Sequence, residues 1–466
     1  MKKSDWILGL VLLIALFLRL FRLTELFHFT MDEELIAWRA WGLFHLHRPF
    51  LIGGISPLQI HLPPYFYYFS SLLLWPFRFD PVGWGWWAGL FSLITVFLLY
   101  KLSRNLLAPL LYSVSLTAIL FDRHYWPLFF NPLFVVLVLW ALKHKHWLVL
   151  MLTLVLAITA DPSNLTLVLF VLIYNARALW KYLWLGAGIF LMPLLLFDLR
   201  HNWQNIAGIS RLLEQAGAKP PNFGGLLLLP QSLARFWYSA QTNLIEVYSY
   251  CIPYAQARLS GISIWLLLAA AIVIILAVRR HREIKLLLLS YFISLGVFGL
   301  LGFSLFDHYL TGLMPIWAIL TTTVIKRLPK ELKFSAVAIF IAVNLYQFSR
   351  VNNPYGFKYK QDLVVWANQN LKGESYGLES ISKCHRENGL RYLFELSGNP
   401  PVKSFMDANF SWLYPNPPIN IQPEKTLLVT DKNDPPVLPV INVNTFGAMK
   451  AYILDNGLPS TPQETR

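Results

Sequence analysis

Long apolar runs separated by short polar turns dominate the chain up to about residue 350. The nearly uncharged runs lie at 7–23, 86–100, 148–160, 163–174, 182–197, 262–278, 286–305 and 309–325. A helix needs roughly 20 apolar residues to cross the hydrocarbon core of a bilayer, and fewer where flanking side chains reach the headgroups. The pattern therefore predicts a bundle of membrane-spanning helices.

The positions of lysine and arginine predict how this bundle is oriented. With Lys2 and Lys3 on the cytoplasmic side, about 11 spans ending at about 334–349 leave every clear basic cluster on that side. We therefore expect a multi-pass plasma-membrane protein with a cytoplasmic N-terminus and an extracytoplasmic C-terminus. The first run is interpreted as a retained anchor, because no small-residue cleavage site follows it.

Several ionisable residues do not follow this rule and lie on the predicted outer side. They are Asp32, Glu33, Glu34, Asp122, Arg123, His124, Asp161, Arg200, His201, Asp307 and His308. Arg19 and Arg22 lie near the outer end of the first span. Such residues either extend to the headgroups or pair with one another around a cavity, and the sequence leaves both alternatives open.

Composition excludes some classes of protein. With 56% hydrophobic residues, the chain has too little polar surface for a soluble protein of 466 residues. The net charge of +14 comes from residues between apolar runs, so we expect no nucleic-acid partner. Cys251 and Cys384 leave only a single disulfide possible. Because the outer loops contain no Asp-x-Asp pair, we expect no metal, and nothing in the chain suggests a cofactor.

The chain divides at about residue 350. Residues 1–350 form the predicted transmembrane domain, with a first outer loop at 24–83 and another at 200–258. Residues 351–466 are polar and combine short apolar runs, such as 426–430, with helical stretches such as 361–371. This mixture predicts a small extracytoplasmic α/β domain.

The first outer loop carries the most specific pattern. After Thr30, three acids are followed by an amphipathic stretch at 33–47, which predicts a helix lying in the membrane interface. Pro63 and Pro64 then precede an apolar, tyrosine-rich segment at 65–77. Thr30 and Glu33 fit a capping box, so the acids could serve helix initiation. Capping accounts for one or two of the three acids.

These motifs resemble those of the polytopic glycosyltransferases with a GT-C fold. Leu18-Arg19-Leu20-Phe21-Arg22-Leu23, the outer Asp32-Glu33 pair and the Pro-Pro-Tyr-x-Tyr-Tyr segment occur in the order typical of the bacterial group similar to protein O-mannosyltransferases and to the lipid A aminoarabinose transferase. Three later segments add to the resemblance: Asp161-Pro162-Ser163, Arg200-His201-Asn202, and His308-Tyr309-Leu310 with Pro315. Many relatives carry histidine where Asp161 stands. The resemblance covers about 1–350.

The resemblance implies a polyprenyl-phosphate sugar donor, transfer with inversion at the outer face, and a lipid, protein or glycan acceptor. A lipid phosphate leaves readily if cations stabilise it, whereas an acceptor hydroxyl needs a base. One carboxylate therefore suffices, unlike the two of glycoside hydrolysis. Asp32 matches the family's first acidic position and is the expected base. Glu33 is the second candidate, or it orients Asp32.

For the phosphate, Arg200 is the expected main contact, because an Arg fork fits phosphate oxygens and stays charged. The remaining candidate substrate-binding residues are Arg123, His201, His308, Tyr309, His61 and Tyr65. Each also has an ordinary alternative role as a headgroup contact or interfacial anchor.

Two other functions remain open. The chain could be a lipid or solute transporter, or a non-catalytic membrane component that presents an outer binding domain. Transporters usually carry ionisable residues near the midplane, in repeats or broken helices. Here these residues gather at one face and no internal repeat is visible, which favours the enzyme.

Overall fold

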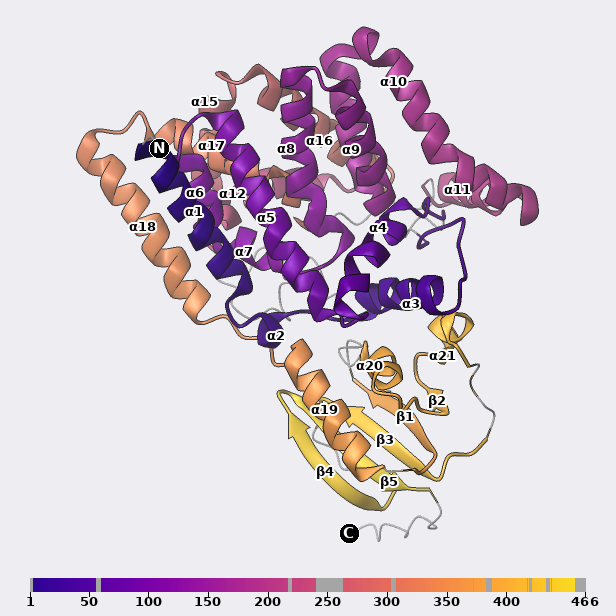
Figure 1. Cartoon of the computed structure of the whole chain (residues 1–466). Helices are drawn as coiled ribbons and strands as arrows, with labels where there is room; N and C mark the ends of the chain where they lie inside the picture. The colour runs from indigo at the N-terminus through magenta and orange to yellow at the C-terminus, as the bar shows by residue number, and fades with distance from the viewer. Residues whose placement is uncertain are drawn as a thin grey trace.

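The computed structural model shows a helical bundle with a small sheet domain at one end, and the N-terminus at the opposite end of the bundle (Figure 1). It describes residues 3–55, 60–216, 220–239, 263–302, 307–371, 373–382, 388–416, 418, 421–432, 436 and 438–456. Both cysteines lie outside the described residues. The bundle ends with α18 (Lys330–Ser349), and the sheet domain begins with α19 (Phe357–Asn370).

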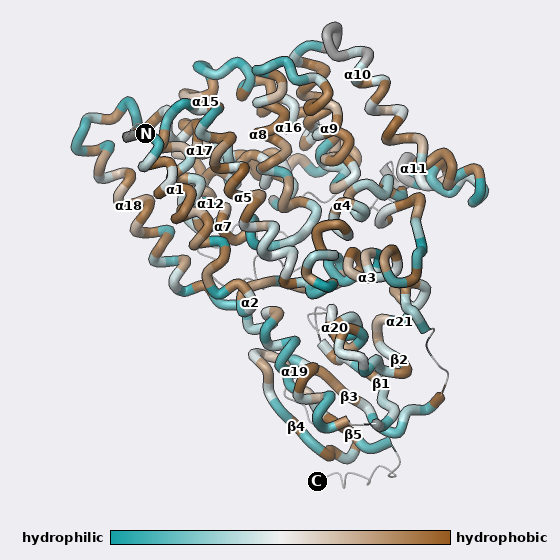
Figure 2. Tube along the Cα trace, in the orientation of Figure 1, coloured by the Kyte–Doolittle hydropathy of each residue, from teal (hydrophilic) through white to brown (hydrophobic). Residues whose placement is uncertain are grey.

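The bundle contains long apolar helices in the order that the apolar runs predict. Its elements are α1 Lys3–Leu20, α5 Val82–Ser103, α6 Leu107–Val114, α7 Leu116–Arg123, η2 Pro127–Phe130, α8 Asn131–His144, α9 Trp147–Ala160, η3 Pro162–Asn164, α10 Leu165–Arg200, α15 Ile264–Val278, α16 Arg282–Leu300, η5 Asp307–Leu313, α17 Met314–Ile325 and α18. In the described part, six helices are long and apolar enough to cross a membrane, and three further apolar helices are shorter. Hydrophobic residues line the bundle helices along most of their length (Figure 2). The predicted class, a polytopic helical protein, is confirmed, while the number of spans and the orientation of the termini stay predictions.

Two breaks interrupt the helices of the bundle. The backbone of α10 is non-helical at Asn175, which separates the two predicted spans 163–174 and 182–197. The apolar stretch before Asp122 is divided into α6 and α7 at Ser115, whose backbone is extended. There Asn344 accepts a hydrogen bond from the Leu116 N–H at 2.8 Å, and the Ser115 hydroxyl donates to the Phe236 carbonyl. Side chains of neighbouring helices thus satisfy polar groups at the break, as a membrane interior requires.

The predicted outer loop at 200–258 is partly helical. It contains α11 Gln204–Ala216, η4 Phe223–Leu227 and α12 Leu228–Trp237. Helix α12 packs inside the bundle: Trp317 donates to Ser232 at 2.9 Å, and Trp237 donates to Thr321 at 2.8 Å. This helix has fewer residues than a span needs, so its burial could not be predicted from the length of an apolar run.

The first outer loop folds as the proline breaks predict. It forms α2 Leu23–Leu26, α3 Met31–His45, α4 Tyr65–Leu74 and η1 Trp75–Phe77. Helix α3 lies across the end of the bundle nearest the sheet domain (Figure 1). The predicted capping box is present, with Glu33 accepting hydrogen bonds from the Thr30 N–H at 2.9 Å and its hydroxyl at 3.0 Å. This box fixes the start of α3, two residues before the predicted stretch.

The C-terminal residues form the predicted α/β domain. Its elements are α19, β1 Tyr376–Ile381, α20 Leu390–Leu396, β2 Lys403–Ser404, α21 Asp407–Phe410, η6 Ser411–Leu413, β3 Lys425–Thr430, β4 Val440–Phe446 and β5 Met449–Asp455. The strand order is β2-β1-β3-β5-β4. Strand β1 is parallel to β2 and β3, whereas β5 is antiparallel to β3 and β4. The run at 426–430 lies in β3, at the centre of this mixed sheet.

Buried polar contacts attach this domain to the first outer loop. Glu34 of α3 accepts hydrogen bonds from the Gly389 N–H at 2.7 Å and the Tyr392 N–H at 3.1 Å, at the start of α20. Lys360 of α19 donates to the Phe29 carbonyl at 2.6 Å. All of these groups are shielded from water, so each contact satisfies a group that would be costly to bury alone.

A buried ion pair joins four helices. Arg19 of α1 and Asp122 of α7 are 0% and 1% exposed, and their side chains lie 2.8 Å apart. Ser92 of α5 donates to Asp122 at 2.7 Å and accepts from Arg19 at 2.8 Å. Tyr112 of α6 donates to the other Asp122 oxygen at 2.8 Å, and Arg19 also donates to the Ser113 carbonyl. Arg19 therefore pairs inside the bundle, whereas Arg22 is exposed and pairs with Glu25.

We predict that Arg19→Met lowers the free energy of unfolding by roughly 3–5 kcal/mol, because Asp122 would remain as an unpaired buried charge. Thermal unfolding of the purified protein in detergent measures this loss. Arg19→Met combined with Asp122→Leu should recover part of it. Lys358→Ala, which breaks an exposed pair with Asp362, is the control and should change the melting temperature little. An Arg19→Met protein as stable as wild type would contradict the prediction.

Candidate functional site

Asp32 lies in the first turn of α3, where the first outer loop meets the bundle. Its side chain is accessible, and one carboxylate oxygen accepts a hydrogen bond from the Trp126 indole at 2.8 Å. The described residues provide no other hydrogen bond to Asp32. The ring of His308 packs edge-on against Trp126, with centroids 4.7 Å apart, and Tyr309 packs against His308 at 4.6 Å. Residues 32, 126, 308 and 309 therefore form one group, which we call the acidic site.

Glu33 is buried beside Asp32 and is fully engaged. One carboxylate oxygen contacts Nε2 of His124, and the other accepts the capping hydrogen bonds from Thr30. The His124 ring packs edge-on against His28 at 4.6 Å. Adjacent helical residues point about 100° apart, so the two acids face different surroundings.

These surroundings give the two carboxylates opposite pKa shifts. Desolvation by the surrounding protein and the charge of Glu33 raise the pKa of Asp32 to about 6, against the opposing effects of Trp126 and His124. For Glu33, burial favours the neutral form, but the charge and hydrogen bond of His124 outweigh it and lower the pKa to about 2. At neutral pH, Glu33 is a fixed anion and Asp32 is an accessible carboxylate of raised basicity.

Asp161 borders the acidic site from the turn between α9 and α10. Its carboxylate accepts a hydrogen bond from the Ser163 N–H at 2.7 Å and so begins η3. Burial raises the pKa of Asp161 to about 6. Its charge also acts on Asp32 and contributes to the raised pKa there. The Asp-Pro-Ser segment thus lies within electrostatic range of the expected base.

The other predicted residues form a second group, at the junction of α4 with α10 and α11. The Tyr65 hydroxyl donates to the Ile189 carbonyl at 2.6 Å, and the His61 N–H donates to Asn205 at 2.8 Å. The His201 ring stacks on Phe197 at 4.1 Å. Arg200 ends α10 and is exposed. No hydrogen bond or ion pair of the described residues joins Arg200 to Asp32, and the expected role of Arg200 at the phosphate stays a prediction.

Arg123 lies at the end of α7 and holds the end of α1. Its guanidinium donates to the Leu18 carbonyl at 3.0 Å and to the Phe21 carbonyl at 2.5 Å. Its side chain is 3% exposed. These contacts give Arg123 a structural task, and its predicted contact with phosphate stays a prediction.

Sequence reasoning missed Trp126 and His28, and it treated His124 as an interfacial side chain. A usable signal was present in Asp122-Arg123-His124, three consecutive ionisable residues at the end of an apolar helix. In the structure each contacts a different partner: Arg19, the end of α1, and Glu33. Nothing in the local sequence marks Trp126 as a partner of Asp32.

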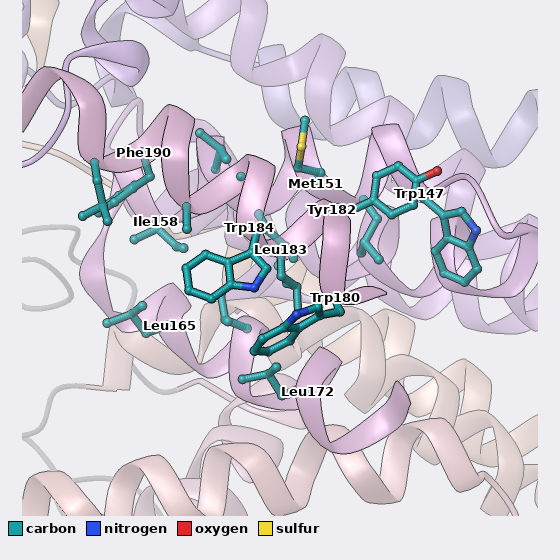
Figure 3. Close-up of a pocket in the computed structure, with 17 residues that line it drawn as sticks. Trp147, Met151, Ile158, Leu165, Leu172, Trp180, Tyr182, Leu183, Trp184 and Phe190 are labelled. Atoms are coloured by element: carbon teal, nitrogen blue, oxygen red, sulfur yellow. The ribbon is translucent and has the colours of Figure 1, made fainter. Parts of the chain in front are cut away.

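An apolar pocket of about 380 Å³ lies between α9 and the two halves of α10 (Figure 3). Its lining includes Trp147, Met151, Ile158, Leu165, Leu172, Trp180, Tyr182, Leu183, Trp184 and Phe190. Ile158 and Leu165 flank the turn that carries Asp161. Ile189, the acceptor of the Tyr65 hydroxyl, precedes Phe190 in the lining. The pocket therefore extends from the neighbourhood of the acidic site along the bundle.

The architecture is that of a GT-C fold, in which a polytopic helical bundle carries a helical outer loop and a further domain. The crystal structure of ArnT from Cupriavidus metallidurans bound to undecaprenyl phosphate shares it, with a TM-score of 0.56 and 12% identity over 99% of this chain and 100% of that chain. ArnT in the apo state gives a TM-score of 0.55 and 12% identity, over 97% and 98%. ArnT is a lipid A aminoarabinose transferase. No family model and no curated protein matches the chain.

The raised pKa of Asp32 predicts that its charge destabilises the folded protein. The pKa is near 3.8 in the unfolded chain and about 6 in the folded protein, so ionisation costs nothing below pH 3.8 and its full penalty applies above pH 6. Asp32→Asn should therefore raise the melting temperature at pH 8, with a gain that shrinks as the pH falls from 6 towards 4. Thermal unfolding in detergent across this range measures the effect.

Glu33→Gln is the control of opposite sign. The lowered pKa of Glu33 stabilises the folded protein above about pH 4.5, and this stability is lost as the pH falls towards 2. The Gln variant should therefore melt below wild type at pH 8. An Asp32→Asn protein that also melts below wild type at pH 8 would contradict the conclusion that the charge of Asp32 destabilises the folded protein.

Proposed function

We propose that the chain is an inverting glycosyltransferase that moves a sugar from a polyprenyl-phosphate carrier to a hydroxyl of a lipid, protein or glycan at the outer face of the plasma membrane. The observation that carries the proposal is Asp32: an accessible carboxylate of raised pKa in the first turn of the helix that lies across the end of the bundle, in a chain with the GT-C fold. A base works best when its pKa lies near the working pH. Both carboxylate oxygens of the buried Glu33 already contact His124 or Thr30, so Glu33 is better suited to holding the first turn of α3 in position.

In this proposal Asp32 takes the proton of the acceptor hydroxyl as that oxygen attacks the anomeric carbon and the lipid phosphate departs. Trp126 holds one oxygen of Asp32, which leaves the other for the acceptor. Glu33, paired with His124, keeps its charge and holds the first turn of α3 in position. His308 and Tyr309 border the sugar through their packing on Trp126.

The carrier fits the apolar features of the chain. An isoprenoid tail is hydrocarbon, and the pocket between α9 and α10 has an apolar lining that begins beside the Asp161 turn. The ArnT crystal structure that shares the fold is bound to undecaprenyl phosphate. We propose that Arg200, His201, His61 and Tyr65, at the outer end of α10, contact the carrier's polar region. This role implies the predicted orientation, with the N-terminus cytoplasmic and the sheet domain outside.

The alternatives make different predictions for the same assay. Purified protein in vesicles is supplied with a radiolabelled polyprenyl-phosphate sugar and candidate acceptors. A glycosyltransferase forms a labelled product, a transporter moves the label across the vesicle without forming one, and a non-catalytic component does neither.

We predict that Asp32→Asn lowers the rate of transfer by roughly 10²–10⁴-fold, as expected when a general base is lost. The Asn side chain can still accept the Trp126 hydrogen bond, so the protein should remain folded and bind the donor. Initial rates at saturating donor, together with the melting temperature, test this.

Glu25→Gln is the matched control, because Glu25 lies in the same outer loop but is half-exposed and, within the described residues, forms its ion pair with Arg22. It should transfer at the wild-type rate. If Asp32→Asn also turns over within threefold of wild type, Asp32 is not the base.

A further inference from the structure

Arg39 of α3 has surroundings that the proposed roles do not explain. It follows Asp32 by seven residues, so both side chains project from the same face of the helix, with their Cα atoms roughly 10 Å apart along its axis. Its guanidinium is half-buried between two aromatic rings, 4.9 Å from the Phe50 centroid and 4.5 Å from the Trp412 centroid. Trp412 belongs to the sheet domain, so the two domains enclose this cation together.

Within the described residues, Arg39 has no anionic partner and no hydrogen bond. Its Nε atom is shielded from water and makes no hydrogen bond. Arg19 and Arg391, in contrast, each have an anionic partner: Arg19 pairs with Asp122, and Arg391, which also stacks on an aromatic ring, pairs with Glu395. Shielding a guanidinium without an anion is unfavourable, and such a group is a ready site for an oxyanion.

Tyr67 connects Arg39 to Asp32. Burial raises the pKa of Tyr67, the charge of Asp32 raises it further, and the charge of Arg39 lowers it, so both charges act on this hydroxyl. The hydroxyl accepts a hydrogen bond from the Gly54 N–H. A Cβ at Gly54 would collide with it, so the loop approaches as closely as glycine allows. The close approach of Gly54 fixes the position of the Tyr67 hydroxyl, on which the charges of Asp32 and Arg39 both act.

The separation of Asp32 and Arg39 suits an in-line transfer. Such a reaction aligns the base, the acceptor oxygen, the anomeric carbon and the departing phosphate. At hydrogen-bond and near-attack distances, this row spans on the order of 10 Å from carboxylate to guanidinium. One sugar ring would then lie beside Tyr67, between the two charged groups.

We propose that Arg39, held between Phe50 and Trp412, binds the phosphate oxyanion of the polyprenyl-phosphate carrier. The inference rests on the proposed function and adds a phosphate contact that sequence reasoning did not identify. It also gives the sheet domain a direct part in the site, since Trp412 forms one wall around the cation.

The test measures binding without turnover. Full-length protein in detergent is titrated with undecaprenyl phosphate, and separately with undecaprenol, which lacks the phosphate. Arg39→Gln should weaken binding of undecaprenyl phosphate by roughly 10- to 100-fold, as expected for a lost charge-assisted hydrogen bond. It should leave undecaprenol binding unchanged. Arg39→Lys should recover part of the affinity, because it restores the charge without the planar fork.

Arg48→Gln is the matched control, since Arg48 is exposed in the same loop. It should bind like wild type. Inorganic phosphate is titrated as a competitor: competition at millimolar concentration indicates that Arg39 recognises phosphate alone, and its absence that the lipid is also needed. Either result supports the site, provided that Arg39→Gln loses affinity for undecaprenyl phosphate.

Binding by Arg39→Gln within twofold of wild type would overturn the proposal. If that variant fails to fold, Trp412→Ala provides the second test, because it opens one wall and should weaken phosphate binding by roughly threefold; unchanged affinity there also overturns it. Failure of the proposed function appears differently, as wild-type protein that binds undecaprenyl phosphate through Arg39 and forms no glycosylated product.

Discussion

The arrangement of the outer face depends on the buried pair between Arg19 and Asp122. Two charges can remain inside an apolar bundle only if partners satisfy both, and here hydroxyls and carbonyls of α5 and α6 complete the set. The pair fixes the end of α7 against α1. Arg123 and His124 follow directly on that end, so the same constraint positions His124 for Glu33. The geometry of the acidic site thus begins with an interaction inside the bundle.

The three consecutive acids of α3, Asp32, Glu33 and Glu34, point in three different directions. Glu33 contacts the bundle through His124, and Glu34 contacts the sheet domain at the start of α20. Asp32 stays accessible between them, and among the described residues it accepts a hydrogen bond from Trp126 alone. Because side chains turn by about 100° per residue, a helix lying across the bundle can attach to both domains and still present one carboxylate to a substrate. The sheet domain is therefore part of what holds α3 in place.

The sequence predicts the features that depend on local pattern. The apolar runs, the capping box of Thr30 and Glu33, and the break at Pro63 and Pro64 each lie within a few residues, and each appears in the structure. Features that depend on packing between distant segments were not predictable. Trp126 reaches Asp32 across 94 positions, and Trp412 comes to Arg39 from the other domain.

The contrast between Asp32 and Glu33 follows from the same physics as the fold. Burial raises the pKa of a carboxyl, whereas an opposite charge and hydrogen bonds to the ionised form lower it. Glu33 has such a partner in His124 and becomes a permanent anion, whose charge then makes its neighbour harder to ionise. Asp32 is left with an indole hydrogen bond, too weak to offset that charge. The Glu33–His124 pair that rigidifies the first turn of α3 therefore also raises the basicity of Asp32. The raised pKa lowers the stability of the folded protein, a cost that a residue needed only for capping would not carry.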